Sequence, residues 1–313
     1  TLVNDTRITC TTPEARTLGA HPMRVDFGSL TSSIANTFPD FLAFNTELGT
    51  VTSVVPAGGP YNLQASVAIT GTVFRSFGAP ACRFGTQVGS WAVISNDTHA
   101  TCQKPRFPDS MRSDVGSMPV HFSPNGQCFP SATSAGSFQV YNSQVTSINV
   151  GGGPATSSIA LEITGQGFVN NTMPGAMCLF EPVGGGTNVE RALQVISSTK
   201  VLCTTPSTGV TATWKVKVAQ NGLTFEPSLY GDPEFVTYDI SQVRVTFVSP
   251  PGGVIGQETE VLLKGSGFAA YGEGQLKCAI GTTLIPAILT RAGNILCTLP
   301  AFQYPGTQSV GVS

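Results

Sequence analysis

Apolar and polar residues alternate in short runs along the whole chain, and glycine or proline bounds most of these runs. The clearest runs occupy residues 67–74, 161–168 and 261–268, and each ends in a glycine turn and a phenylalanine. A period of two is typical of β-strands that bury one face, so alternate residues should point into a core. The residues expected there are Val67, Ile69, Val216 and Val218. Helical periodicity is weak, and residues 31–42 could hold at most a turn, so an all-β fold is predicted.

The three runs belong to a longer repeat. Gly71, Gly165 and Gly265 occupy the same place in each run, 94 and 100 residues apart, and a Gly/Pro cluster precedes each run. Self-similarity at such a period indicates tandem domains. The predicted division is the C-terminal part of a domain (1–46), two complete domains (47–142 and 143–241) and a domain lacking its last strand (242–313). A half-sandwich as short as 1–46 is too small to fold alone, so we expect the parent protein to extend both ways.

Each complete domain holds about six or seven alternating runs in roughly 100 residues, which is the pattern of an antiparallel sandwich of immunoglobulin type. Asn-Gly pairs at 125–126 and 221–222 follow strand-like segments in the two complete domains. Both residue types accept the positive φ that a type I′ turn requires, so the pairs predict tight hairpins.

A pair of cysteines recurs in register in the three copies. The pairs are Cys82 and Cys102, Cys178 and Cys203, and Cys278 and Cys297. Their separations of 20, 25 and 19 residues favour one disulfide within each domain over reduced buried cysteines. Each disulfide should contribute roughly 3 kcal/mol by restricting the unfolded chain. Zinc is not expected, because the cysteines lack the close spacing of zinc ligands.

Two cysteines and three asparagines complete the candidate sites. Cys10 aligns with the second member of each pair, so we expect its partner before residue 1. Cys128 has no equivalent, and its alternatives are Cys10, a segment outside this sequence, another chain or a free thiol. N-x-[ST] sequons begin at Asn4, Asn96 and Asn170, and the first two each precede a second-type cysteine by six residues. A secreted protein would carry glycans at such sites, and we expect them at Asn4 and Asn96.

The repeated motifs resemble the IPT/TIG domain, the immunoglobulin-like module of plexins and related receptors and of certain transcription factors. The resemblance rests on V-x-x-V-x-P, I-T-G-x-x-F, Cys-Arg-Phe-Gly, Cys-x-x-Pro and F-x-x-Y, and covers nearly the whole chain. It implies tandem immunoglobulin-like β-sandwiches. Two departures, Val150 in place of proline and Val73 in place of the glycine at Gly167, touch no position on which the sandwich should depend.

Composition limits the possible partners and the compartment of the protein. Charged residues make up 11% of the chain and the net charge is −2, so nucleic acid is not expected as a partner. No stretch approaches the roughly 18 apolar residues of a membrane span, so no membrane contact is expected within this segment. Persistent disulfides place the protein outside the cell, either secreted or at the cell surface.

The sequence offers no catalytic or metal motif. The three histidines, His21, His99 and His121, fall at non-equivalent places in the repeat without metal-ligand spacing. No G-x-S-x-G segment supplies a nucleophile, and the glycine turns lack the further glycine and lysine of nucleotide-binding loops. We expect no enzyme activity, no cofactor and no metal.

The leading functional prediction is a non-catalytic extracellular structural protein. Repeats that each contain a disulfide would form a rod that packs into a filament, surface fibre or matrix, for example a ciliary hair or wall fibre. Its partners would be copies of itself or other matrix and surface proteins. The alternative that the resemblance implies is the ectodomain of a plexin-like receptor or adhesion protein. An accessory module of a secreted enzyme also remains open.

Overall fold

The computed structural model describes residues 2–4, 7–9, 11–12, 17–23, 41–44, 49–111, 115–130, 136–170, 173–271 and 274–313. This part of the chain is all β, as predicted, and its helical elements are two short 3-10 turns, η1 (Asp109–Met111) and η2 (Ile240–Gln242). Of the turn predicted at 31–42, residues 31–40 lie outside the described residues. Phe41 and Leu42 belong to strand β4 (Phe41–Ala43).

Residue contacts divide the chain into two compact units. Unit 1 comprises Thr1–Val55, Leu63–Pro108 and Ser117–Gln139, and unit 2 comprises Pro56–Asn62, Asp109–Gly116 and Val140–Ser313. The predicted domain boundaries stay a prediction. Residues 47–142, 143–241 and 242–313 are called the first, second and third repeat below.

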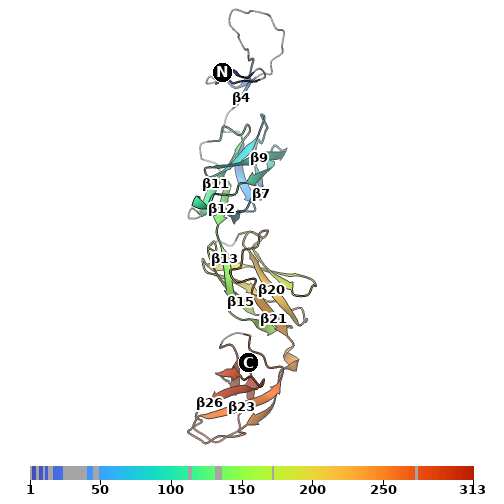
Figure 1. Cartoon of the computed structure of the whole chain (residues 1–313), viewed down its shortest axis with the longest axis vertical. Coiled ribbons are helices and arrows are strands. Elements are labelled where there is room, and N and C mark those ends of the chain that lie inside the picture. The colour runs from blue at the N-terminus through green and yellow to red at the C-terminus, as the bar shows by residue number, and fades with distance from the viewer. Residues whose placement is uncertain are drawn as a thin grey trace, which may run out of the picture. The chain divides into compact units, whose positions relative to one another are not determined.

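Unit 1 holds most strands of the first repeat (Figure 1). These are β5 (Thr50–Val55), β7 (Ala65–Thr72), β8 (Ala81–Phe84), β9 (Gln87–Asn96), β10 (His99–Lys104), β11 (Gly116–Ser123) and β12 (Gly136–Tyr141). Their sheet order is β5-β7-β10-β9-β8-β11-β12. The long β9 pairs with β8 through its N-terminal half and with β10 through its C-terminal half, so one strand belongs to both layers. Two short pairs lie nearer the N-terminus: β1 (Leu2–Asn4) with β2 (Arg7–Ile8), and β3 (Gly19–His21) with β4.

Unit 2 contains the complete second repeat, which is a sandwich of two sheets (Figure 1). One sheet has the order β13 (Gln144–Ile148), β15 (Ala160–Gln166), β19 (Lys200–Thr204) and β18 (Gln194–Ser197). The other has the order β14 (Gly152–Pro154), β21 (Glu234–Tyr238), β20 (Ala212–Ala219), β16 (Met177–Pro182) and β17 (Val189–Ala192). Buried side chains from Val145 to Phe235 fill the space between them as one cluster.

Unit 2 also contains β6 (Gly58–Pro60) and the third repeat. The third repeat forms one continuous sheet order, β22 (Arg244–Ser249), β23 (Thr259–Ser266), β26 (Ile295–Leu299), β25 (Thr283–Leu289), β24 (Lys277–Ile280) and β27 (Val310–Val312). Strand β25 pairs with both β24 and β26, so it repeats the role of β9. The same strand pairing, with one strand shared by both layers, therefore recurs in the first and third repeats.

Period-two alternation correctly identified the core. Val67, Ile69 and Val218 are fully buried and Val216 is 1% exposed. Their neighbours in sequence, such as Ser66 and Ala68, are exposed. The buried face of each strand thus follows directly from the phase of its apolar residues.

The glycine of the I-T-G-x-x-F motif has a packing role that is the same in all three repeats. A Cβ on Gly71 would collide with the carbonyl oxygen of Thr50 on β5 and lie 2.8 Å from the ring of Phe74. A Cβ on Gly165 or Gly265 would collide in the same way with a carbonyl oxygen of the first strand and with the phenylalanine ring of its own repeat. The motif needs glycine because the backbone of the first strand and an aromatic ring both pack directly against this position.

Val73 adopts the backbone conformation that glycine has at the same place in the other two repeats. Gly167 and Gly267 have φ of +70° and +73°, and Val73, at the same place in the first repeat, has a φ of +54°. A β-branched side chain is sterically unfavourable in this left-handed region. The first repeat therefore carries local backbone strain that the other two avoid.

The prediction of tight type I′ hairpins is wrong. Gly126 and Gly222 have positive φ, but Asn125 and Asn221 do not, as a type I′ turn would require. Instead, the Asn125 side-chain oxygen accepts hydrogen bonds from the backbone N–H groups of Gln127 and Cys128, and Asn221 does the same for Leu223 and Thr224. The asparagines open long loops as Asx turns, a local bond that competes with the hairpin.

Val73→Gly should stabilise the first repeat by about 1 kcal/mol, because relief of the left-handed valine exceeds the extra chain entropy that glycine loses. The measurement is the unfolding midpoint by differential scanning calorimetry. The reciprocal change Gly167→Val should destabilise the second repeat, since its Cβ would collide with the Asn142 carbonyl oxygen. A lower midpoint for Val73→Gly would show that position 73 carries no strain.

Candidate functional site

Three disulfides join the six cysteines that the repeat predicts. Cys82 pairs with Cys102, Cys178 with Cys203 and Cys278 with Cys297, at Cα–Cα distances of 5.9, 6.4 and 6.4 Å. In the second repeat Cys178 lies on β16 and Cys203 on β19, which belong to different sheets. All six residues are buried. Each bond is thus a covalent link between the facing layers of a sandwich.

The other predicted residues lie apart from these disulfides. Cys128 is exposed and free in the Asx loop after Asn125, whereas Cys10 lies outside the described residues. Asn96 is exposed at the turn between β9 and β10, where its side-chain oxygen accepts hydrogen bonds from both the N–H and the hydroxyl of Thr98. Asn170 is exposed, and Asn4 lies in β1. Glycans at these positions stay a prediction.

Side chains that could bind a metal ion are scattered over the part of the chain that the structure describes. They contain no group of three or more His, Cys, Asp or Glu that could hold a metal ion. His121 is buried on β11, where burial and the charge of Arg83 lower its pKa. Among the same residues no helix has the length and apolarity needed to cross a bilayer.

A buried polar network lies where the first repeat leads into the second. Ser143, in the connection between β12 and β13, donates a hydrogen bond of 2.5 Å to the Glu226 carboxylate and accepts one of 2.9 Å from Gln220. Gln220 in turn accepts from the backbone N–H of Val169. Burial raises the pKa of Glu226 to about 7, and these hydrogen bonds offset only part of that rise. Burial, together with Glu226, raises the pKa of the adjacent Tyr141 hydroxyl.

Lys104, at the end of β10, is a second buried charge that the sequence interpretation missed. Its Nζ donates to the carbonyl oxygens of Leu63 (2.6 Å) and Pro105 (3.0 Å) and lies 4.7 Å from the centre of the Phe107 ring. Burial lowers its pKa to about 8. The signal was present, because Lys104 shares the inward phase of Cys102 on its strand.

The outer sheet face of the first repeat carries an uncharged row of side chains. Directly opposed residues run across four strands in the order Val55, Ala68, Thr101 and Val93. Val55 and Val93 are each 62% exposed, and Trp91 on β9 is 74% exposed. We call the four opposed residues the first outer row.

The equivalent rows differ between the other two repeats. The third outer row, Ser249, Leu262, Leu296 and Ile288, is also uncharged, and Ile288 is 66% exposed. The second outer row, Asn149, Glu162, Leu202 and Gln194, is polar, and Glu162 forms an exposed ion pair with Lys200 at 2.7 Å. Uncharged outer rows are therefore a property of the first and third repeats, although Glu260 and Lys264 flank Leu262 on the outer face of β23.

Comparison of the sequence with protein-family models identifies one matching family. The family model described as IPT/TIG domain matches residues 50–140 and 244–313, just over half of the chain. No curated protein matches the sequence. These two matched segments fall in the first and third repeats, which carry the uncharged outer rows.

Solved structures resemble the chain only distantly. The plexin A4 full extracellular region has a TM-score of 0.38 and 12% identity, covering 85% of this chain and 28% of its own. The mixed-linkage glucan utilization locus protein SGBP-B of Bacteroides ovatus has a TM-score of 0.26 and 12% identity, covering 83% and 69%. Titin domains I67–I69 have a TM-score of 0.25 and 8% identity, covering 79% and 84%. The chain thus spans about a quarter of the plexin A4 region, and likeness at this level supports no functional argument.

Replacing both Cys178 and Cys203 by alanine should lower the free energy of unfolding of the second repeat by about 3 kcal/mol, because the unfolded chain regains its freedom. Urea titration monitored by the fluorescence of the buried Trp214 measures this, in a Trp91→Phe background. Cys128→Ala is the matched control, since that thiol is exposed and free. Equal midpoints for the double variant and the control would contradict a stabilising role.

The stability of the second repeat should fall as the pH rises from about 4.5 to 7. The folded state raises the pKa of Glu226 from 4.5 to about 7, so it binds the proton more tightly than the unfolded chain does. That contribution is complete below pH 4.5 and is lost as the carboxyl ionises, above about pH 7. Glu226→Gln should flatten this slope in Trp214-monitored unfolding, and Glu162→Gln, on the exposed ion pair, should leave it unchanged. An unchanged slope in Glu226→Gln would refute the assignment.

Proposed function

The chain belongs to the IPT/TIG domain family. On that premise we propose that it is a non-catalytic extracellular structural protein. Its disulfide-bonded domains would pack with other copies in a filament, surface fibre or matrix. Domains of this family are typically binding modules rather than enzymes. Three disulfides within an all-β chain are typical of an extracellular or secreted protein, since reducing compartments do not preserve such bonds.

The observation that carries the proposal is the uncharged surface of the first and third outer rows. Exposed contiguous apolar residues on a sheet face favour association with another surface. Here Val93 and Ile288 occupy equivalent places, because each lies opposite the residue that precedes the second cysteine of its repeat. Two such faces on one chain would allow it to contact two neighbours, which is what a filament or matrix requires.

A cell-surface receptor or adhesion ectodomain is the second candidate, and the position of Asn96 favours it. Asn96 lies opposite His99 at one end of the sheet that carries the first outer row. A glycan there would hinder close packing of a second copy along that face. Close packing of copies and full glycosylation at Asn96 are therefore competing expectations.

Val93→Lys combined with Ile288→Lys should weaken self-association at least tenfold, because a charge buried against an apolar partner is costly. Sedimentation velocity over a concentration series measures the association. Gln194→Lys is the matched control, since Gln194 occupies the same place in the polar second outer row. A parent chain that stays monomeric throughout the series would overturn the filament proposal and leave the ectodomain candidate standing.

A further inference from the structure

Three side chains of complementary chemistry meet in the buried polar network of the second repeat. The Ser143 hydroxyl donates a hydrogen bond of 2.5 Å to Oε2 of Glu226, and Nε2 of Gln220 donates one of 2.9 Å to the same hydroxyl oxygen. Ser143, Glu226 and Gln220 are 3%, 5% and 1% exposed. A hydroxyl, a carboxyl group and a primary amide are therefore in contact at a place that excludes bulk water. We call these three residues the Ser143 cluster.

The hydrogen bonds of the Ser143 cluster give each group a position that acyl transfer requires. The Ser143 hydroxyl is a nucleophile in contact with a carboxylate that can accept its proton. The carbonyl oxygen of Gln220 accepts a hydrogen bond of 2.8 Å from the backbone N–H of Val169, which would stabilise negative charge on that oxygen. The amide nitrogen lies 3.4 Å from Oε1 of Glu226, so the same carboxyl group can protonate it as it leaves. Nucleophile, base, oxyanion donor and leaving-group acid are thus all present.

Backbone contacts fix both segments that carry the cluster. Val145, two residues after Ser143, donates its N–H to the Pro227 carbonyl oxygen at 2.9 Å. Glu226 donates its own N–H to the carbonyl oxygen of Val218 on β20 at 2.8 Å. Groups that are held together in this way need no encounter in solution, and for well-oriented pairs this corresponds to effective concentrations on the order of 10⁵ M or more.

The acid–base group of the cluster has a pKa suited to neutral pH. Burial raises the pKa of the Glu226 carboxyl group to about 7, so both of its protonation states are populated near neutral pH. A group of that pKa can both accept and return a proton there. The titratable group beside it is the Tyr141 hydroxyl, and burial, together with Glu226, raises the pKa of that hydroxyl, so it stays protonated.

The first repeat shows that the sandwich does not require this cluster. Counted from the glycine of the I-T-G-x-x-F motif, Gly49 takes the place of Ser143, and Pro124, just before the Asn-Gly pair, takes that of Gln220. The ring of Phe122 fills the space, since it lies 2.8 Å from the position of a Cβ on Gly49. An apolar arrangement serves the same fold, so the buried polar groups of the second repeat call for a reason of their own.

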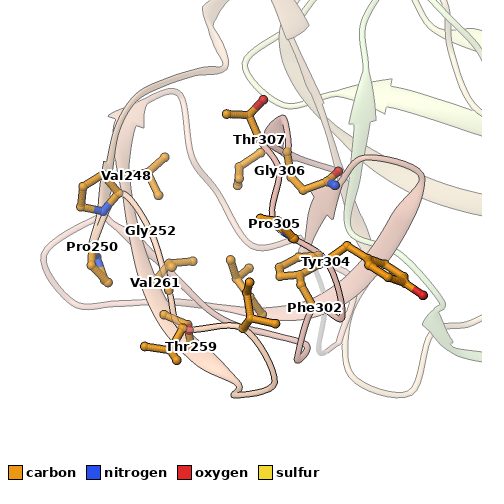
Figure 2. A pocket seen from close by; sticks show the side chains of 17 residues that line it. Val248, Pro250, Gly252, Thr259, Val261, Phe302, Tyr304, Pro305, Gly306 and Thr307 are labelled. Atoms are coloured by element: carbon orange, nitrogen blue, oxygen red, sulfur yellow. The ribbon is translucent and has the colours of Figure 1, made fainter.

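A cavity in the third repeat lacks such a combination of groups (Figure 2). It has a volume of about 390 Å³, and Pro250, Thr259 and Tyr304 are among the residues that line it. The described residues around it include no carboxylate and no histidine, so its hydroxyl groups have no base among the lining side chains.

We propose that Ser143 and Gln220 join in an intramolecular ester bond, with Glu226 as the acid–base group. Oγ of Ser143 attacks Cδ of Gln220, its proton passes to the Glu226 carboxylate, and the carbonyl oxygen takes up the negative charge beside the Val169 N–H. The carbon–nitrogen bond then breaks, Glu226 returns the proton to the departing nitrogen, and ammonia leaves. One hydroxyl and one primary amide give one ester and one ammonia, with no change in oxidation state and no co-reactant.

The reaction requires only a small movement of one side chain. The amide carbon of Gln220 is one bond, about 1.3 Å, from the nitrogen that already contacts the Ser143 oxygen, so the amide must turn to present its carbon. Once formed, the ester is buried, and exclusion of water protects it from hydrolysis. It would tie the β12–β13 connection covalently to the turn after β20. The inference does not rest on the proposed function, because the bond lies within one chain.

The test is the intact mass of the full 313-residue chain, compared with the mass that its disulfide-bonded sequence requires. Ester formation should lower the mass by one ammonia, about 17 Da, and digestion should give a peptide that joins the segments of Ser143 and Gln220. Ser143→Ala should abolish both signals, and Glu226→Gln, which keeps the shape of the side chain, should slow the reaction at least tenfold. Ser228→Ala is the matched control, since Ser228 donates to the carboxylate of Asp232, and it should leave the mass loss unchanged.

Two further measurements separate the ester from other losses of ammonia. Ring closure at an Asn-Gly pair gives the same mass change, but it maps to Asn125 or Asn221 and persists in Ser143→Ala. Mild alkali applied to the unfolded parent chain should cleave an ester and leave glutamate at position 220. A parent chain of full mass overturns the proposal, as does a mass loss that is independent of Ser143 or a link that resists alkali. Glu226→Gln keeps the comparison valid if Ser143→Ala does not fold, which the emission of the buried Trp214 reports.

Discussion

A buried sulfur–sulfur bond between facing β-layers is the constraint on which the sandwiches of this chain depend. A domain of about 100 residues buries a limited share of its surface, and here short strands and many glycines restrict the core further. The bond between β16 and β19 fixes the distance between the two sheets at their centre, and Phe168, Trp214 and Phe235 pack in the same cluster. Layer spacing is therefore set covalently, and the surrounding loops can vary between repeats.

Much of the fold could be predicted because it is local or periodic. The phase of Val67 and Ile69 gives the buried face of β7, and cysteines repeated in register give the inter-sheet bonds. Predictions failed where two local interactions compete. The Asn125 and Asn221 side chains accept backbone hydrogen bonds, which the hairpin interpretation of an Asn-Gly pair ignores. The left-handed backbone at Val73 could not be predicted from valine, since a β-branched residue rarely adopts it.

The candidate sites could not be predicted from the alternation of apolar and polar residues, because they depend on loop packing and strand register. Glu226 lies in a loop, and only the packing of the β12–β13 connection around it buries its carboxyl group. The outer rows arise from strand register, which brings Val93, Thr101 and Ala68 into line from three separate strands. Register depends on bulges such as the one between Cys102 and Gln103, and a single sequence does not specify these.

The crowded glycine of the I-T-G-x-x-F motif has a consequence for the history of the repeats. Surface loops and the outer rows can change independently after a duplication, because their exposed positions have room for another side chain. At Gly71, Gly165 and Gly265 any missense change adds at least one carbon where a carbonyl oxygen and an aromatic ring already lie. These three positions are therefore natural anchors for aligning diverged copies, including any that have lost the cysteine pair.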